Sequence, residues 1–471
     1  MPRMPTLLAL ALALSPGPLA AAAVDYRLEF LPREGELAVR ACLREPQSAL
    51  RFGVPDADAA PFLLEARRDG GRELQREGNA LRARDWRAGE CLHLRIDARR
   101  VAAAAASYAS LREGPDLLLP TRAWFWRPRG LAGGSGTEVT VVLPADWALS
   151  VPWQPLDAPP HRRFRLDDSD PGWPGMVAIG RFDERDIVAG SGALRLALTG
   201  APAPTQQAIL ARHVGEVAAD VLAGFPHLLD ARPQLLLVPV PGAREPVPFG
   251  QSLRGGGTGI VLYANPRATL AQLRGSWTLT HELVHLAHPY LGDEGSWIAE
   301  GLATWYQNVL RARAGRMTPG EAWRYLAAGF ERGRADAADA SLRETARGDA
   351  GRHTMRVYWS GTALMLLGDV ALRTRADAPA SLDLALSRYL ACCRALRVRR
   401  DPGLFLADLD RAVGGDTLAA LYRAHADASA FPDLAPAWRA LGITLRGDGD
   451  LAYSDDPTAA ALRAAIMGPA R

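Results

Sequence analysis

Hydrophobic and polar residues alternate in short runs along the first part of the chain, from about residue 25 to residue 200. Tyr26–Phe30 and Cys91–Ile96 show this alternation and Val139–Leu143 is a short apolar run, and turn-forming glycine, proline and aspartate residues separate them. A period of two is typical of strands that bury one face. The pattern therefore predicts an N-terminal β-sandwich domain over residues 24–200.

The pattern changes after the proline-containing segment 199–204, which we interpret as a linker. A helical pattern begins at Thr205, and short apolar strands follow at Leu235–Val238 and Ile260–Tyr263. We therefore predict an α+β lobe over residues 205–315.

Apolar residues then recur every three or four positions, which is typical of helices. Thr318, Pro319 and Glu321 form the signature of a capping box with proline at the first helical position. Four more helices are expected at residues 357–372, 382–393, 404–413 and 417–425. The chain is thus predicted to be a multidomain α+β protein, with a helical lobe over residues 316–435 and a C-terminal tail at 436–471.

The most informative motif is His281-Glu282-Leu283-Val284-His285. Two imidazoles four residues apart on a helix lie about 40° apart and one turn along, so both can reach one metal ion. Glu282 then lies beside the ion, where its carboxylate can take a proton from water. The motif indicates metal-assisted hydrolysis.

Zinc needs a third protein ligand, and the best candidate is Glu300 in a second helix that Ser296 could cap. Thr304 and Asn308 lie on the same line of that helix, so Thr304 is expected beside the ligands, and Gly301 leaves room for a close neighbour. The alternative interpretation of this line is a solvated polar edge. Asp293 and Glu294 remain rival third ligands.

His288 is not expected to be a ligand. It lies two turns, roughly 10 Å, from His281 along the helix axis, so the three imidazoles could not meet one ion without a helix break. Pro289 comes too late in the chain to provide that break. Four other scattered histidines are expected to be structural or on the surface: His213, His227, His353 and His425.

The His281-Glu282-x-x-His285 motif, followed by Trp297-Ile-Ala-Glu300-Gly-Leu-Ala, resembles the gluzincins, which are zinc peptidases with thermolysin-like catalytic domains. It is most similar to their glycyl-aminopeptidase and alanyl-aminopeptidase branches. The resemblance implies that His281, His285 and Glu300 bind one Zn²⁺ and that Glu282 is the general base. It also implies that the α+β lobe is thermolysin-like. Too few residues follow position 435 for the PDZ domain that some relatives carry.

In these families a tyrosine stabilises the oxyanion, typically within a Tyr-x-Lys-Gly run. Tyr358-Trp-Ser-Gly361 matches that run only at its tyrosine and glycine. The resemblance assigns the role to Tyr358, because a phenol can donate a hydrogen bond to a developing alkoxide. The alternative is an ordinary core tyrosine.

Two features depart from the family pattern. Only 14 residues separate His285 from Glu300, about one helical turn fewer than usual. The upstream strand also lacks the glutamate with which alanyl aminopeptidases recognise a free amine, so exopeptidase and endopeptidase activity both remain open. In its place stands a glycine run, and we predict that Gly256, Gly257 and Gly259 form an edge for an extended peptide. The alternative is a flexible turn.

The N-terminus predicts export. Arg3 precedes the apolar core Leu7–Leu14, and prolines and small alanines follow, so we predict a cleaved signal peptide over residues 1–23. The mature protein is then periplasmic or secreted. No later segment is apolar for long enough to predict a membrane span.

The chain has four cysteines. In an oxidising compartment Cys42 and Cys91 are expected to form a disulfide. Cys392 and Cys393 should point about 100° apart on a helix and therefore not bond to each other.

The 55 basic residues are all arginine, and with 52 acidic residues they leave a formal net charge of +3. This balance gives no indication of a nucleic-acid partner. The absence of lysine also excludes a catalytic lysine. The aromatic residues Trp124, Trp126, Trp147 and Trp153 are expected in the core rather than in a sugar-binding platform.

Taken together, the motifs predict a secreted or periplasmic zinc metallopeptidase that acts on peptides or proteins. Two alternatives remain, a zinc hydrolase of a non-peptide substrate and a non-catalytic binding protein. An intact Glu282 is unfavourable for the second, because a binding protein needs no base beside the ion. The sequence does not specify an oligomeric state.

Overall fold

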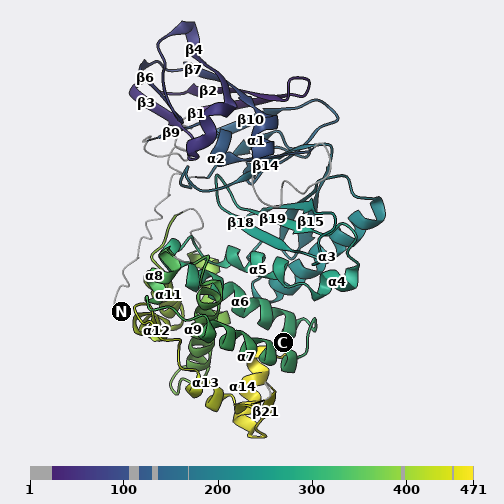
Figure 1. Cartoon of the computed structure of the whole chain (residues 1–471), viewed down its shortest axis with the longest axis vertical. Coiled ribbons are helices and arrows are strands. Elements are labelled where there is room, and N and C mark those ends of the chain that lie inside the picture. The colour runs from purple at the N-terminus through teal and green to yellow at the C-terminus, as the bar shows by residue number, and fades with distance from the viewer. Residues whose placement is uncertain are drawn as a thin grey trace, which may run out of the picture.

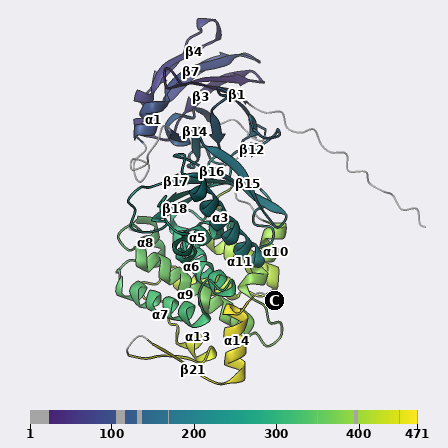
Figure 2. The ribbon, with the colours of Figure 1, turned by 90° about the vertical axis from the view of Figure 1, so that its right-hand side faces the viewer.

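The computed structural model describes residues 24–104, 116–129, 136–167, 169–348, 350–393, 398–447 and 450–469. The predicted signal peptide, residues 1–23, lies outside the described residues. Along the long axis of the molecule, a sheet-rich N-terminal domain is followed by a mixed sheet with its helices and then by a helical lobe (Figure 1). A view from the side shows the same succession (Figure 2).

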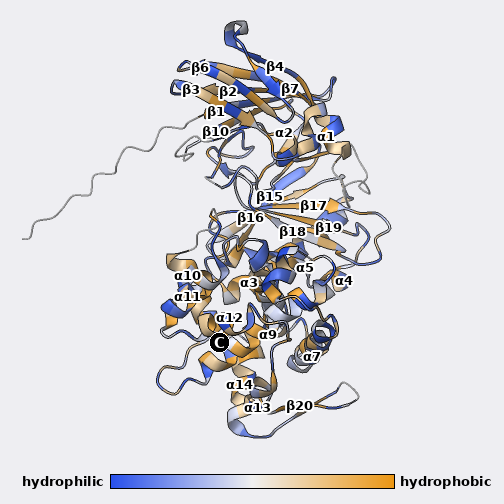
Figure 3. Ribbon diagram, turned by 60° about the vertical axis from the view of Figure 1, so that its left-hand side comes forward, coloured by the Kyte–Doolittle hydropathy of each residue, from blue (hydrophilic) through white to orange (hydrophobic). Residues whose placement is uncertain are grey.

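The N-terminal domain consists of three sheets, with strand orders β12-β13-β10-β1-β2-β7-β4, β5-β6-β3-β9 and β11-β14-β8. Their strands are β1 (Val24–Leu31), β2 (Glu36–Leu43), β3 (Gln47–Gly53), β4 (Leu63–Arg68), β5 (Gln75–Glu77), β6 (Ala80–Trp86), β7 (Cys91–Asp97), β8 (Leu117–Pro120), β9 (Arg127–Arg129), β10 (Glu138–Val142), β11 (Ala148–Ser150), β12 (Gln154–Pro155), β13 (Arg163–Arg165) and β14 (Met176–Gly180). Buried and more exposed positions alternate along β1 and β2, as predicted from their sequence, and Figure 3 shows hydrophobic and hydrophilic residues mixed along the strands of this domain.

The tryptophans of this domain contribute to its core. Trp124, Trp126 and Trp153 are each 1% exposed. Trp147 is partly buried and packs against the same cluster. A sugar-binding platform would need exposed rings, so the prediction of core packing is confirmed for the three buried tryptophans.

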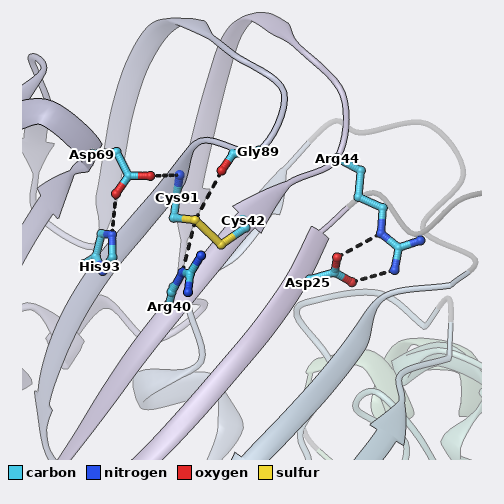
Figure 4. The surroundings of a disulfide bond; sticks show 8 residues. All are labelled: Asp25, Arg40, Cys42, Arg44, Asp69, Gly89, Cys91 and His93. Carbon is cyan, nitrogen blue, oxygen red and sulfur yellow. Dashed lines mark hydrogen bonds and ion pairs between the residues drawn. A yellow bond between two sulfur atoms is a disulfide. The ribbon is translucent and has the colours of Figure 1, made fainter.

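Cys42 and Cys91 face each other across β2 and β7 and are bonded as a disulfide (Figure 4). The expectation for the second pair is wrong, because Cys392 and Cys393 are also joined. That expectation assumed a continuous helix. Helix α10 (Leu382–Cys392) ends between the two, and Cys393 has φ −134° and ψ 8°, so the helical separation of their side chains does not apply.

The central sheet has the order β15-β16-β17-β19-β18 and is parallel only between β16, β17 and β19. Its strands are β15 (Asp183–Ala189), β16 (Gly192–Leu198), β17 (Gln234–Pro239), β18 (Phe249–Leu253) and β19 (Gly259–Ala264). One face packs on α3 (Pro204–Gly224) and α5 (Thr278–Val284), and α4 (Leu270–Gly275) adjoins α3. The other face packs on β8 and β14 of the N-terminal domain.

The predicted domain boundary at residue 200 is therefore too late. β15 and β16 precede it, yet they belong to the central sheet, because β16 pairs in parallel with β17. Alternation alone could not distinguish a hairpin of the first domain from one of the second. Arg195 on β16 connects the two domains. It donates hydrogen bonds to the carbonyl oxygens of Val151 (2.7 Å) and Trp153 (2.9 Å) in the N-terminal domain.

The C-terminal lobe is helical, as predicted. Its elements are α6 (Ser296–Arg313), α7 (Pro319–Ala335), α8 (Leu342–Gly348), α9 (Thr354–Arg373), α10, α11 (Pro402–Val413), α12 (Thr417–His425), α13 (Ala435–Ala440), β20 (Ile443–Leu445), β21 (Leu451–Tyr453) and α14 (Pro457–Met467). The capping box of Thr318 and Glu321 is present at the start of α7. Together with the sheet-rich N-terminal domain, this lobe confirms the predicted α+β class.

The predicted C-terminal tail is part of this lobe. Residues 436–469 include a hairpin and α14, whose Ile466 and Met467 are fully buried. Arg313 of α6 donates a hydrogen bond of 2.8 Å to the carbonyl oxygen of Ile466. None of the helices in the described part of the chain combines the length and hydrophobicity that crossing a bilayer requires.

Helices α6 and α9 approach each other closely at Gly301 and Gly361. A Cβ atom added to Gly301 would overlap the backbone of Gly361, and one added to Gly361 would overlap the carbonyl oxygen of Trp297. The two backbones are therefore in direct contact, which only glycine permits. Glu300 precedes the first glycine and Tyr358 lies one turn before the second, so this crossing sets the distance between them.

We expect Gly361→Ala to lower the free energy of unfolding by about 1–3 kcal/mol, because the added methyl group has no space and the helices must separate. Urea denaturation followed by circular dichroism measures the loss. Gly275→Ala is the matched control, since a Cβ there meets nothing within 4 Å. A Gly361→Ala protein as stable as the wild type would contradict the close contact.

His213 on α3 is 2% exposed, and neither ring nitrogen has a hydrogen-bond partner among the described residues. Burial lowers its pKa to about 4. Between about pH 6.5 and pH 4 the unfolded chain therefore binds a proton that the folded chain does not. The folded state loses stability as the pH falls through this window, by roughly 3 kcal/mol in total.

We expect His213→Leu to remove this part of the acid sensitivity, so that its urea midpoint falls less steeply than that of the wild type between pH 6.5 and pH 4. His227→Leu, at an exposed position, serves as the control. Parallel pH profiles for the wild type and His213→Leu would show that His213 is not the group responsible.

Candidate metal centre and active site

The two motif histidines lie at the end of α5. His281 is inside the helix and 2% exposed, and His285 opens a single 3₁₀ turn that continues to Ala287 and is 8% exposed. Their Nε2 atoms are 3.1 Å apart. The spacing within the motif therefore brings both imidazoles to one point, as the sequence predicts.

Glu300 of α6 completes the group. Its Oε2 atom lies 3.1 Å from Nε2 of His281 and 3.5 Å from Nε2 of His285. His281, His285 and Glu300 form the one group of possible metal ligands found among the described residues, with ligand atoms within 4.8 Å of one another. The rival carboxylates are engaged elsewhere: Asp293 accepts a hydrogen bond from Tyr290, and Glu294 pairs with Arg399.

These distances fit a zinc ion. Ligands bonded to zinc at about 2.0–2.1 Å in a tetrahedron stand about 3.3 Å apart, and the observed separations are 3.1–3.5 Å. The orientation of His281 fits as well. Its Nδ1 lies 2.8 Å from Oε1 of Gln307. Because an amide oxygen only accepts, Nδ1 carries a hydrogen and Nε2 is the nitrogen left for an ion.

The charges of the group depend on one another. Burial opposes ionisation of Glu300, but the charges and hydrogen bonds of His285 and His281 hold its pKa well below the usual value. Burial also lowers the pKa of His281, yet Glu300 outweighs this effect and raises it. Negative charge on Glu300 thus favours positive charge at the histidine pair, which a bound metal cation would also supply.

Glu282 is 6% exposed and lies against β18, the edge strand of the central sheet. A Cβ added to Gly250 would lie 2.6 Å from Cγ of Glu282, so glycine makes room for this side chain. The hydroxyl of Ser252, two residues along the same face, lies 3.0 Å from Oε2 of Glu282 and 2.8 Å from its carbonyl oxygen. The strand therefore fixes the carboxylate from one side.

Tyr358 of α9 also lies beside the group. Its ring stacks on His281, with centroids 5.9 Å apart and planes inclined by 8°. Burial, the charge of Glu300 and a hydrogen bond to Glu300 all raise its pKa. The phenol is therefore protonated at neutral pH and can donate a hydrogen bond.

The glycine run is not part of this group, and the prediction of a peptide-binding edge there is wrong. A Cβ on Gly256 would lie 3.0 Å from Nε1 of Trp153, one on Gly257 would overlap Pro152, and one on Gly259 would lie 2.7 Å from Oε1 of Gln234. The neighbour that approaches these glycines is the chain itself. β19, which Gly259 begins, is also paired on both sides, whereas β18 is the edge.

The neighbours of the ligands also differ from the prediction. The hydroxyl of Thr304 is buried and has no hydrogen-bond partner among the described residues. The side chain that accepts a hydrogen bond from Nδ1 of His281 is that of Gln307. Gln307 follows Glu300 by seven residues and so lies two turns along the same helix face, which the sequence could have indicated. Ser296 is the first residue of α6, and Gly295 occupies the cap position without a side-chain hydrogen bond.

His288 lies closer to the centre than predicted. α5 ends at Val284, before Pro289, and His288 has extended backbone angles of φ −132° and ψ 156°. Its Nε2 lies 3.0 Å from Nδ1 of His285, on the side of that ring away from Glu300. It is not part of the group of possible ligands, but that it binds no metal stays a prediction, because the argument from a continuous helix does not hold.

No family sequence profile and no curated protein sequence matches the chain. Solved structures do resemble it. That of an aminopeptidase N family protein from Idiomarina loihiensis covers 90% of this chain and 79% of its own, with a TM-score of 0.66 at 13% identity. A variant M1 zinc metallopeptidase from Deinococcus radiodurans, bound to a Tyr-Ser-Ala substrate, covers 88% of this chain and 95% of its own, with a TM-score of 0.52 at 16% identity.

At these identities the likeness concerns the fold. Both matches extend over the N-terminal domain and both lobes, since they cover nine-tenths of the chain or nearly so. This agrees with the gluzincin resemblance of the motifs. The chain therefore has the fold of the M1 zinc metallopeptidases.

Proposed function

We propose that this protein is an exported zinc metallopeptidase that hydrolyses peptide bonds with water. The observation that carries the proposal is the convergence of His281, His285 and Glu300, with Glu282 held by Ser252 next to His281 in the motif and Tyr358 stacked on His281. The ligand set of two imidazoles and one carboxylate leaves a fourth position open, which is typical of catalytic zinc. The aminopeptidase N family protein and the M1 zinc metallopeptidase that share the fold support the same chemistry.

Each residue has a defined task. A bound zinc ion supplies Lewis acidity, which polarises the scissile carbonyl and makes water acidic. Glu282 accepts the proton of the attacking water and delivers it to the leaving amine. Tyr358 would keep its proton and donate a hydrogen bond to the oxygen on which negative charge develops. Gln307 holds the ring of His281 in place.

The substrate is proposed to be a peptide or a protein in extended conformation. Among the described residues β18 pairs only with β19, so its outer edge can accept an additional strand beside Glu282. The Deinococcus enzyme of the same fold was solved with a tripeptide substrate. Residues 1–23 have the pattern of a signal peptide, and we propose that the enzyme acts in the periplasm or outside the cell.

The ligand assignment predicts the metal content of variants. We expect one zinc per chain in the wild type and its loss in His281→Ala and Glu300→Ala, because each variant removes a ligand. Glu282→Gln should retain zinc but hydrolyse peptides about 10²–10⁴-fold more slowly, since it cannot accept a proton. Elemental analysis and mass spectrometry of a digested peptide library measure the two effects.

Glu294→Gln is the matched control for Glu300→Ala, because Glu294 is an acidic residue of the preceding segment that pairs with Arg399. It should keep both zinc and activity. Full zinc content in Glu300→Ala together with loss of zinc in Glu294→Gln would reassign the third ligand. A zinc-loaded wild type that cleaves no member of the library would contradict the proposed activity.

The contact between Ser252 and Glu282 predicts a change in kcat. We expect Ser252→Ala to reduce kcat about tenfold, with zinc content and KM unchanged, because a charge-assisted hydrogen bond that orients the base is lost. Gln251→Ala, at the exposed neighbouring position, is the control. Steady-state kinetics on one cleaved peptide provide the measurement, and a change confined to KM would assign Ser252 to substrate binding instead.

A further inference from the structure

His288 is a buried histidine close to the proposed metal centre. It has no role in the proposed mechanism. It is 2% exposed and lies between His285 and its own neighbour Pro289. Its Nδ1 is 2.7 Å from the carbonyl oxygen of Pro289, and its Nε2 is 3.0 Å from Nδ1 of His285. The three groups form a chain of hydrogen bonds that leads directly to a metal ligand.

The chemistry of this chain fixes the position of each hydrogen. A carbonyl oxygen can only accept, so Nδ1 of His288 must carry the hydrogen of that bond. In a neutral imidazole the other nitrogen, Nε2, is then an acceptor. Nδ1 of His285 must therefore donate to it. This leaves the lone pair of His285 Nε2, the atom 3.1 Å from Nε2 of His281, for a metal ion.

The surrounding structure prevents His288 from leaving this position. Nη2 of Arg254 donates hydrogen bonds to the carbonyl oxygen of His285 at 2.7 Å and to that of His288 at 3.3 Å. The guanidinium thus closes the turn after α5. The ring of Phe405 also lies near the imidazole, 6.3 Å away between centroids.

We propose that His288 is a positioning residue of the metal centre that holds His285 in the tautomer with hydrogen on Nδ1. The inference rests on the proposed function only in requiring that the site binds zinc. His288 orients the ring of His285 and prevents the tautomer of His285 that would direct an N–H group at the ion. Loss of such an outer partner typically weakens metal binding 10–100-fold.

The affinity for zinc tests the proposal without any assay of hydrolysis. Competition with a chelator gives the Kd for zinc of the purified full-length protein. We expect His288→Phe, which has no acceptor, to bind zinc 10–100-fold more weakly. His288→Gln, whose amide oxygen can accept from His285, should stay within about threefold of the wild type. His213→Phe is the matched control at another buried histidine and should leave the Kd unchanged.

A measurement on the unmutated chain complements the variants in case His288→Phe does not fold. Nitrogen-15 NMR of the zinc-loaded protein, labelled in its histidines, distinguishes the two tautomers of each ring. We expect hydrogen on Nδ1 for His288 and His285, with the His288 signals identified by their absence in His288→Gln. An Nε2–H signal for His288 would overturn the proposal.

The outcomes separate this proposal from the proposed function. A wild type that binds zinc with the expected tautomers but hydrolyses no peptide contradicts the activity and leaves the role of His288 standing. A wild type that hydrolyses peptides with an unchanged zinc affinity in His288→Phe contradicts the role of His288 alone. Equal weakening in His288→Phe and His213→Phe would also overturn it, because the effect would then be one of general stability.

Discussion

The metal centre depends on the contact between the backbones of α6 and α9. Glu300 and Gly301 are consecutive on one helix, and Tyr358 and Gly361 are one turn apart on the other. Because no side chain separates the helices at the glycines, the residues beside them are brought together from positions nearly 60 residues apart. A larger residue at either glycine would move the third ligand and the proposed oxyanion donor apart at the same time. The position of both groups is thus a consequence of the steric packing of the helices as well as of the hydrogen bond between Tyr358 and Glu300.

The charged groups around this position are buried or partly buried, and their charges compensate one another only in part. Glu282 and Glu300 bring two negative charges, and the nearby Arg254 contributes one positive charge. Burial lowers the pKa of Arg254 to about 10, which still leaves it charged at neutral pH. Two carboxylates and one guanidinium leave an excess negative charge, which a divalent cation would compensate. Burying carboxylates without such compensation is costly, so the composition of the site itself favours a cation.

The ligands and the helices could be predicted from the sequence because local patterns encode them. Spacing of four along one helix brings His281 and His285 together, and the apolar stripe of α6 identifies the face opposite Glu300. The remaining features depend on which segments meet. Gly256 contacts Trp153 from another domain, and Ser252 reaches Glu282 across 30 positions. The pairing of β16 with β17 determines where the first domain ends. The end of helix α10 allows Cys392 and Cys393 to bond. None of these contacts has a periodic signature.

The short connection between His285 and Glu300 accounts for both the early end of α5 and the position of His288. Its 14 residues have to reverse the chain between α5 and α6 and still return Glu300 to the histidine pair. The helix therefore ends at Val284, and the chain turns at once, which places His288 beside His285 instead of one turn further along. A turn this tight leaves backbone carbonyl groups without the hydrogen bonds that a longer helix would have given them. Arg254 donates hydrogen bonds to two of these carbonyl groups. The short connection, which departs from the family pattern, thus also places His288 where it can orient the proposed ligand His285.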